Sequence, residues 1–156
     1  MAVMSQGCVE QVGTPRELYE RPRTRFVADF LAVRNLLEAE VLAVEDGRAM
    51  LRTRGGLQLA AADDGGYRTG ATVSIGIRPE RMTLSGPSAD GVAGTLDDEI
   101  YLGDKTDWRV RLGDEIVTVA EAAGSASGRK RGDAVTLTIP AAAVLRLEHA
   151  AGAAKP

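Results

Sequence analysis

The spacing of apolar residues along the chain changes once, near residue 36. From Leu37 to Ala43, apolar side chains at odd positions alternate with Glu38, Glu40 and Leu42. The same period of two recurs within residues 48–54, 73–77, 106–112 and 135–139, and turns rich in Gly and Asp separate these runs. Alternation over short runs between such turns is typical of half-buried strands. The pattern therefore predicts a body made of short β-strands after residue 36.

The first twelve residues predict a hairpin. Two short strand-like runs, 2–4 and 9–12, flank a turn that contains Gly7. An isolated two-stranded hairpin is only marginally stable in water. We therefore expect this hairpin to need a further surface on which to pack.

Residues 13–31 predict two short helices. Thr14, Pro15 and Glu17 form a capping box with proline at the first helical position. Pro22 disfavours helix at the residue before it, so the first helix is short. Thr24 is a suitable N-cap for the second helix.

An apolar stripe marks the second helix. Phe26, Val27, Phe30 and Leu31 fall on one face at helical spacing, and we expect this face to be core. The alternative is that the linker docks on a separate body through exposed aromatic residues, with Tyr19, Phe26 and Phe30 as the docking side chains.

The β-rich part contains an internal similarity. Residues 70–77 (GATVSIGI) resemble residues 132–139 (GDAVTLTI), and each segment is followed by a proline, Pro79 or Pro140. The two segments follow polar loops and precede another short apolar run. This repetition predicts two related half-units packed into one small barrel.

Composition narrows the possible chemistry. The net charge is −3 and aromatic residues make up 4% of the chain, which disfavours a nucleic-acid binder of the basic or base-stacking kind. One cysteine, Cys8, excludes a disulfide within the chain, and one histidine, His149, leaves no basis for a His-containing triad. None of the three lysines follows a glycine, so the phosphate-binding pattern GxxxxGK[ST] is absent. We expect no cofactor, no metal site and no catalysis by this chain.

Arg78 and Glu80 flank Pro79 at the end of a predicted strand. The default interpretation is a solvated strand end, because exposed charges and weak ion pairs are common there. The alternative is a contact across domains or with a ligand.

Several sequence motifs, taken in their order along the chain, resemble those of a known family. The run from Ala2 to Asn35 is similar to the end of the nucleotide-binding domain of importer-type ABC transporter ATPases, in the polyamine, iron and sulfate group. The residues that carry this resemblance are Gly13, Pro15, Glu17, Tyr19, Pro22, Phe26, Val27, Ala28, Phe30 and Asn35. The IRPE at 77–80, the YLG at 101–103 and the strand at 132–137 resemble the family's transport-associated OB domain. The run Ala32-Val33-Arg34 stands where the family often has a glycine, so we expect a stiffer connection between the helices and the β-strands.

The resemblance implies a fold and a domain organisation. The fold is mainly β, a small OB-like barrel of two related half-units preceded by a short hairpin and two short helices. Residues 1–35 would be the end of the nucleotide-binding domain with a helical linker, 36–149 the transport-associated domain, and 150–156 a disordered tail. The family's phosphate loop, signature loop, Walker-B strand and switch histidine would all lie upstream of Met1.

The resemblance also implies a function. The chain would be a non-catalytic regulatory and dimerisation module of an importer ATPase, and it would form a homodimer. In the full-length parent its partners would be permease subunits and a second ATPase subunit, at the cytoplasmic face of the cell membrane, without insertion into the membrane.

A second hypothesis is binding of a small oxyanion such as molybdate or sulfate. Related barrels bind such anions through backbone amides and through Ser, Thr and Lys side chains. The candidate residues for a ligand or an interface are Ser74, Arg78, Glu80, Lys105 and Thr106.

Overall fold

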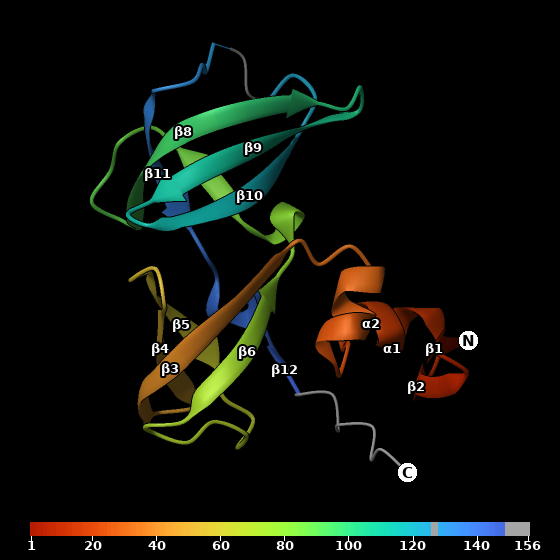
Figure 1. Ribbon diagram of the computed structural model, residues 1–156. Helices are drawn as coiled ribbons and strands as arrows, with labels where there is room; N and C mark the ends of the chain where they lie inside the picture. The colour runs from red at the N-terminus through yellow and green to blue at the C-terminus, as the bar shows by residue number, and fades with distance from the viewer. Residues whose placement is uncertain (126–127, 149–156) are drawn as a thin grey trace.

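The change of hydrophobic period near residue 36 coincides with a change of architecture. The computed structural model describes residues 1–125 and 128–148. Figure 1 shows a β-body of two sheets, one above the other, with the N-terminal segment beside the lower sheet. The predicted domain boundary at residue 149 and the predicted disordered tail at 150–156 lie outside the described residues.

The N-terminal segment contains the expected hairpin and two helices. The hairpin consists of β1 (Ala2–Ser5) and β2 (Cys8–Val12), and the helices are α1 (Pro15–Glu20) and α2 (Arg25–Phe30). The capping box at the start of α1 is confirmed, since the Thr14 side chain accepts from the Glu17 amide and the Glu17 carboxylate accepts from the Thr14 amide. The Thr24 hydroxyl caps α2 through the amide of Val27. Local sequence signals thus place both helix starts correctly.

The lower sheet is antiparallel and contains five strands in the order β12-β6-β3-β4-β5. These strands are β3 (Asn35–Glu45), β4 (Arg48–Thr53), β5 (Gln58–Ala62), β6 (Thr72–Ile77) and β12 (Val144–Leu147).

The upper sheet is also antiparallel, in the order β10-β9-β8-β11-β7. Its strands are β7 (Thr83–Ser85), β8 (Val92–Tyr101), β9 (Lys105–Leu112), β10 (Glu115–Ala122) and β11 (Ala134–Thr138).

The two sheets are built by the same plan, which confirms the predicted half-units. In each, a long strand leads into a hairpin and a fourth strand, and a 3₁₀ turn follows, at Pro79–Arg81 (η1) or Ala141–Ala143 (η2). The fifth strand of each half-unit then crosses over: β7 joins the upper sheet and β12 joins the lower sheet. This exchange of strands holds the half-units together, because each sheet is completed by a strand of the other.

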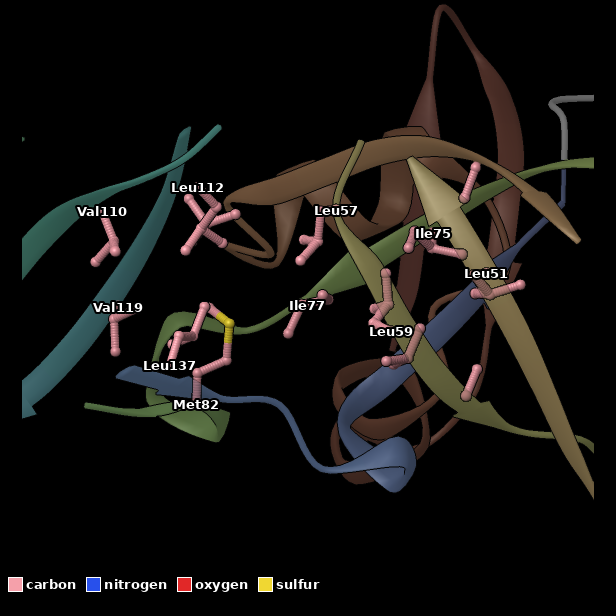
Figure 2. Packing of buried hydrophobic residues seen from close by; sticks show 14 of the residues in the cluster. Leu51, Leu57, Leu59, Ile75, Ile77, Met82, Val110, Leu112, Val119 and Leu137 are labelled. Carbon is pink, nitrogen blue, oxygen red and sulfur yellow. The ribbon is translucent and has the colours of Figure 1, made fainter. Parts of the chain in front are cut away.

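One hydrophobic core runs through both sheets. Figure 2 shows Leu51, Ile75 and Ile77 of the lower sheet continuing into Val110 and Leu137 of the upper sheet, and all five are at most 1% exposed. Trp108, the largest fully buried side chain, lies in the same cluster. Burying one leucine, isoleucine or valine side chain of this core contributes about 1.5–3 kcal/mol to stability, relative to leaving it exposed. The core therefore fixes the relative position of the two sheets.

The stripe expected to be core on α2 is only partly buried, and the prediction is wrong for its two aromatic residues. Phe26 is 40% exposed and Phe30 is 67% exposed, whereas Val27 and Ala28 are fully buried. Val27 packs with residues of the hairpin and α1, and Ala28 packs with residues of the β-body. Because α2 is held between these two surfaces, its buried face is rotated by about one residue from the stripe that spacing alone selects.

Candidate functional site

The joint between the N-terminal segment and the β-body is organised around Arg78. The side chain of Arg78 lies at the end of β6, is 4% exposed, and donates to the carbonyl of Tyr19 at 2.5 Å and to that of Leu31 at 2.7 Å. Tyr19 is in the last turn of α1, and Leu31 is the C-cap of α2. The last carbonyls of a helix have no partner within the helix, and a cation there is favourable. One guanidinium thus binds the C-terminal ends of both helices.

Tyr19 and Glu80 complete the joint. The Arg78 guanidinium lies 3.6 Å from the centroid of the Tyr19 ring, and the Tyr19 hydroxyl donates to the Glu80 carboxylate at 2.7 Å. The pKa of the Tyr19 hydroxyl is raised, mainly by the hydrogen bond to Glu80 and to a lesser extent by burial. Cation–π contact of this kind contributes roughly 0.5–2 kcal/mol, depending on desolvation.

The sequence Ile77–Glu80 explains this geometry. Pro79 ends the ladder of β6 and begins η1, and the residue before a proline is held in the extended region, as observed for Arg78 at φ −75° and ψ 136°. The default interpretation of Arg78 as part of a solvated strand end is wrong. The guanidinium is buried because the helices pack against this corner, which strand periodicity cannot reveal.

Gln11 and Glu148 form further hydrogen bonds to the loop between the two helices, and the sequence patterns indicated neither contact. The side chain of Gln11 donates from Nε2 to the main-chain carbonyl of Arg21 at 3.0 Å, and its Oε1 accepts from the main-chain amide of Arg23 at 2.9 Å. The hairpin is thereby attached to the loop between the helices. The amide of Glu148 donates to the carbonyl of Arg23 at 2.6 Å, beside a parallel bridge between Thr24 and Glu148. Gln11 lies in a predicted strand, but its burial depends on contacts with the loop between the helices and cannot be read from the sequence.

Asn35 forms a link between the two sheets. Its side-chain amide donates to the carbonyls of Ile77 at 3.1 Å and Thr118 at 2.8 Å, and its oxygen accepts from the amide of Thr118 at 2.7 Å. The side chain is 4% exposed. Asn35 thus fixes the start of β3, where the chain enters the β-body.

The structure groups only some of the predicted site residues. Arg78, Glu80 and Tyr19 lie together at the joint. The Ser74 hydroxyl bonds to the carboxylate of Glu38, whose other contact is an ion pair with Arg25 at 3.3 Å.

Lys105 and Thr106 lie on β9 of the other sheet. Lys105 is paired with Asp107 at 3.6 Å, and Thr106 is buried. Within the described ranges, neither residue forms a hydrogen bond or an ion pair with Ser74 or Arg78.

The joint is suited to positioning rather than to chemistry. The guanidinium of Arg78 is occupied by main-chain carbonyls, and the Tyr19 hydroxyl is occupied by Glu80. Within 1–125 and 128–148, no three His, Cys, Asp or Glu side chains gather as metal ligands. None of the helices in this described part of the chain has the length and apolar character needed to cross a membrane.

Comparison with known proteins gives similar chains among importer ATPases. The chain is 41% identical over 141 residues to the spermidine/putrescine import ATP-binding protein PotA 1 of Pseudomonas aeruginosa, covering 89% of this chain and 38% of that protein. It is 38% identical to PotA of Rubrobacter xylanophilus, covering 88% of this chain and 37% of that protein. It is 34% identical to the Fe(3+) ions import ATP-binding protein FbpC of Brucella suis, covering 69% and 30%. The chain thus spans between 31% and 38% of the length of the PotA relatives it matches.

The fold also matches a solved structure. The cytoplasmic molybdate-binding protein ModG, in a form with molybdate bound, superposes with a TM-score of 0.65 over 72% of this chain and 94% of ModG, at 18% identity. This likeness confirms the β-rich fold with two curled sheets. The TOBE domain family matches residues 75–147. Residues 75–147 are therefore a TOBE domain, in a chain that matches the C-terminal region of importer ATP-binding proteins such as PotA and FbpC.

Proposed function

We propose that this chain is the regulatory and dimerisation module of an ABC importer ATPase, and that it does not catalyse a reaction by itself. The observation that supports this most directly is the buried Arg78 joint. A domain that senses or limits the movement of a neighbouring motor must be attached to it by a stiff connection. Arg78, Tyr19 and Glu80 supply such a connection between the helices and the barrel.

The joint would transmit movement because it holds both helices at once. A displacement of α1 breaks the bond from Arg78 to the Tyr19 carbonyl, and a displacement of α2 breaks the bond to the Leu31 carbonyl. Hydrogen bonds to a charged donor contribute about 1.5–3 kcal/mol each. The two helices and the barrel would therefore move as one unit when the motor domain moves.

Exposed apolar side chains on the N-terminal segment support a motor domain as the neighbour. Phe30 is 67% exposed and Phe26 is 40% exposed on α2, and Met4 and Val9 of the hairpin are each more than half exposed. Phe26 and Phe30 are neighbours at i and i+4 on α2, and Met4 and Val9 are cross-strand partners. Contiguous exposed apolar side chains of this kind mark interaction surfaces. We propose that this segment packs against the nucleotide-binding body of the parent ATPase.

Dimerisation would require only weak self-association. In the assembled transporter, two ATPase subunits would be held beside each other by the permease subunits, at the inner face of the cell membrane. Tethering converts the second contact into an intramolecular one, at an effective concentration of about millimolar for short linkers. Two copies of the barrel could then associate in the transporter while remaining largely monomeric when isolated at micromolar concentration.

A chimera tests the proposal. The matched C-terminal region of PotA 1 from Pseudomonas aeruginosa is replaced with this chain, and uptake of spermidine is measured in cells that lack their own importer. We expect the chimera to support uptake, and Arg78→Met to lower it while the protein is still produced and folded. Arg68→Met changes an exposed arginine and is the matched control. Equal uptake by the Arg78→Met chimera and its parent would contradict a transmitting joint.

Self-association is measured separately. Sedimentation equilibrium of the chain should show a monomer–dimer equilibrium with a dissociation constant of about 0.1–1 mM, in the range that tethering can compensate. A chain that stays monomeric at about 2 mM would contradict the dimerisation part of the proposal and leave the joint untouched.

Oxyanion binding is the second candidate, and the likeness to the ModG fold supports it. Three of its candidate residues already have partners within the chain. Arg78 binds main-chain carbonyls, Ser74 bonds to a carboxylate, and Lys105 is paired with Asp107, so an oxyanion would have to compete with these contacts. Calorimetry with molybdate, tungstate, sulfate and spermidine separates the candidates. Heat of binding to an oxyanion at micromolar concentration would favour this second function.

A further inference from the structure

A groove lies where the first strand of one half-unit meets the hairpin of the other. It has a volume of about 330 Å³. Its apolar walls come from both sheets and consist of Leu36, Leu37, Ile100 and Ile116. Its polar lining consists of Arg34, Asn35, Asp107, Arg109 and Thr118. Small-molecule sites commonly have this composition, with apolar walls and a few placed polar groups, in volumes of about 300–1,000 Å³.

Asp107 is the unusual member of this lining. The residue is 4% exposed, and its Oδ1 atom is buried without a hydrogen-bond partner in the described part of the chain. The cation paired with it, Lys105, lies 3.6 Å from that oxygen, which is beyond hydrogen-bonding distance. A buried carboxylate is costly unless it is paired and hydrogen-bonded. Asp107 therefore retains capacity for a charged donor.

Two arginines, Arg34 and Arg109, line the same groove as this carboxylate. Neither Arg34 nor Arg109 makes an ion pair or a side-chain hydrogen bond with any residue in 1–125 or 128–148. By contrast, Arg111, two residues further along β9, is paired with Asp97 at 3.0 Å. The groove thus presents two uncommitted guanidinium groups, which can each bind a carboxylate through two parallel hydrogen bonds.

We propose that this groove binds a small zwitterion of the amino-acid class. Its ammonium group bonds to Asp107, its carboxylate bonds to Arg34 or Arg109, and its short aliphatic part lies against the leucine and isoleucine walls. The lining carries both signs of charge, so a ligand with one sign meets repulsion. A simple amine is repelled by the two arginines, and a simple carboxylate is repelled by Asp107.

The position of the groove connects it to the joint. Arg34 follows Leu31 by three residues, and the carbonyl of Leu31 accepts from Arg78. Asn35, in the same lining, holds the start of β3 to the carbonyls of Ile77 and Thr118. A ligand that pulls Arg34 towards Asp107 would tighten the connection between α2 and the barrel. Binding itself does not depend on the proposed regulatory function.

Calorimetry with the full chain tests the proposal. The probes are glycine, β-alanine, 4-aminobutyrate, 5-aminovalerate and leucine, and the single-charge controls are butyrate, isovalerate and butylamine. We expect at least one zwitterion to bind with a dissociation constant of about 1 mM or lower, at least roughly tenfold tighter than every control. No binding of any zwitterion at about 10 mM, or equal binding of butyrate, would overturn the proposal.

Two variants assign the charges. Asp107→Asn should weaken binding of the zwitterion by about tenfold or more and remove its preference over butyrate, because the partner of the ammonium is lost. Arg34→Gln or Arg109→Gln should weaken the zwitterion and butyrate together, and the position that has this effect identifies the arginine that binds the carboxylate. Arg111→Gln, outside the groove, is the matched control and should leave both unchanged. Emission of the buried Trp108 shows whether each variant is folded. Unchanged selectivity in folded Asp107→Asn protein would overturn the assignment independently of the ligand series.

Discussion

Replacing Arg78 with methionine tests whether the joint is held by its guanidinium. Methionine keeps most of the length and apolar contact of the arginine stem but cannot donate to the carbonyls of Tyr19 and Leu31. The change therefore removes two hydrogen bonds, of 2.5 and 2.7 Å, and the contact with the Tyr19 ring, while it leaves the packing volume nearly unchanged.

The expected loss of stability follows from these contacts. Two hydrogen bonds from a charged donor contribute about 3–6 kcal/mol together, and the cation–π contact about 1 kcal/mol. Two effects reduce the net loss, because water can reach the helix ends in the variant and methionine does not require desolvation of a charge. We therefore expect Arg78→Met to destabilise the joint by about 3 kcal/mol, and Arg78→Lys by roughly half as much, since an ammonium lacks the planar fork.

Two measurements are needed, because the N-terminal segment can detach and unfold locally while the barrel stays folded. Urea unfolding followed by Trp108 emission reports on the barrel core, in which this side chain is fully buried. Hydrogen exchange of the Leu18 and Ala28 amides reports on opening of the helices, and protection there should fall by about a hundredfold, which corresponds to roughly 3 kcal/mol. If Arg78→Met changes neither the urea midpoint nor this protection by more than about 0.5 kcal/mol, the joint is not held by the guanidinium.

Three further predictions concern single residues. Ala32 has φ +61° at the end of α2, where the amides of Ala32 and Val33 donate to the carbonyls of Asp29 and Ala28, a Schellman ending that favours glycine. Ala32→Gly should therefore stabilise the chain by about 0.5–1 kcal/mol in urea unfolding, and a decrease would show that the backbone relaxes there. Burial raises the pKa of Tyr67 to about 12, so its neutral form is favoured in the folded chain, and stability present below pH 10 should be lost as pH rises towards 12. Tyr67→Phe should unfold like the parent at pH 7 and lose about 2 kcal/mol less than the parent between pH 10 and 12; parallel losses would contradict the burial of this hydroxyl. A Cβ on Gly94 would lie 2.9 Å from the carbonyl oxygen of Arg111, so Gly94→Ala should destabilise by about 2 kcal/mol, while Gly86→Ala, in open space, should change stability by less than about 1 kcal/mol.

The sequence predicted the elements of this fold well because their signals are local. The capping box at Thr14 and the cap at Thr24 act within one helical turn, and both appear as expected. Alternation from Ala49 to Thr53 identified the buried face of β4. The similarity of residues 70–77 to 132–139 identified the half-units, because each repeat places the same strand, proline and turn in the same order.

Signals of this kind fail where one element is packed against two others. The aromatic residues of α2 fit a helical stripe, but Val27 and Ala28 form the buried face, because the hairpin and the β-body contact the helix from different sides. Arg78 has the sequence context of a charged strand end, yet it is 4% exposed.

The sequence by itself determined which segments become strands and helices, where they begin, and that the strands form two copies of one plan, since each of these depends on neighbours within a few residues. Only the tertiary structure decided that the last strand of each copy crosses into the other sheet, that Arg78 closes both helix ends, and that Asp107 shares one groove with Arg34 and Arg109. These arrangements join residues far apart in the chain, as in the Asn35–Thr118 link across 83 positions. Their energies depend on burial and on distances that exist only after the two sheets have packed.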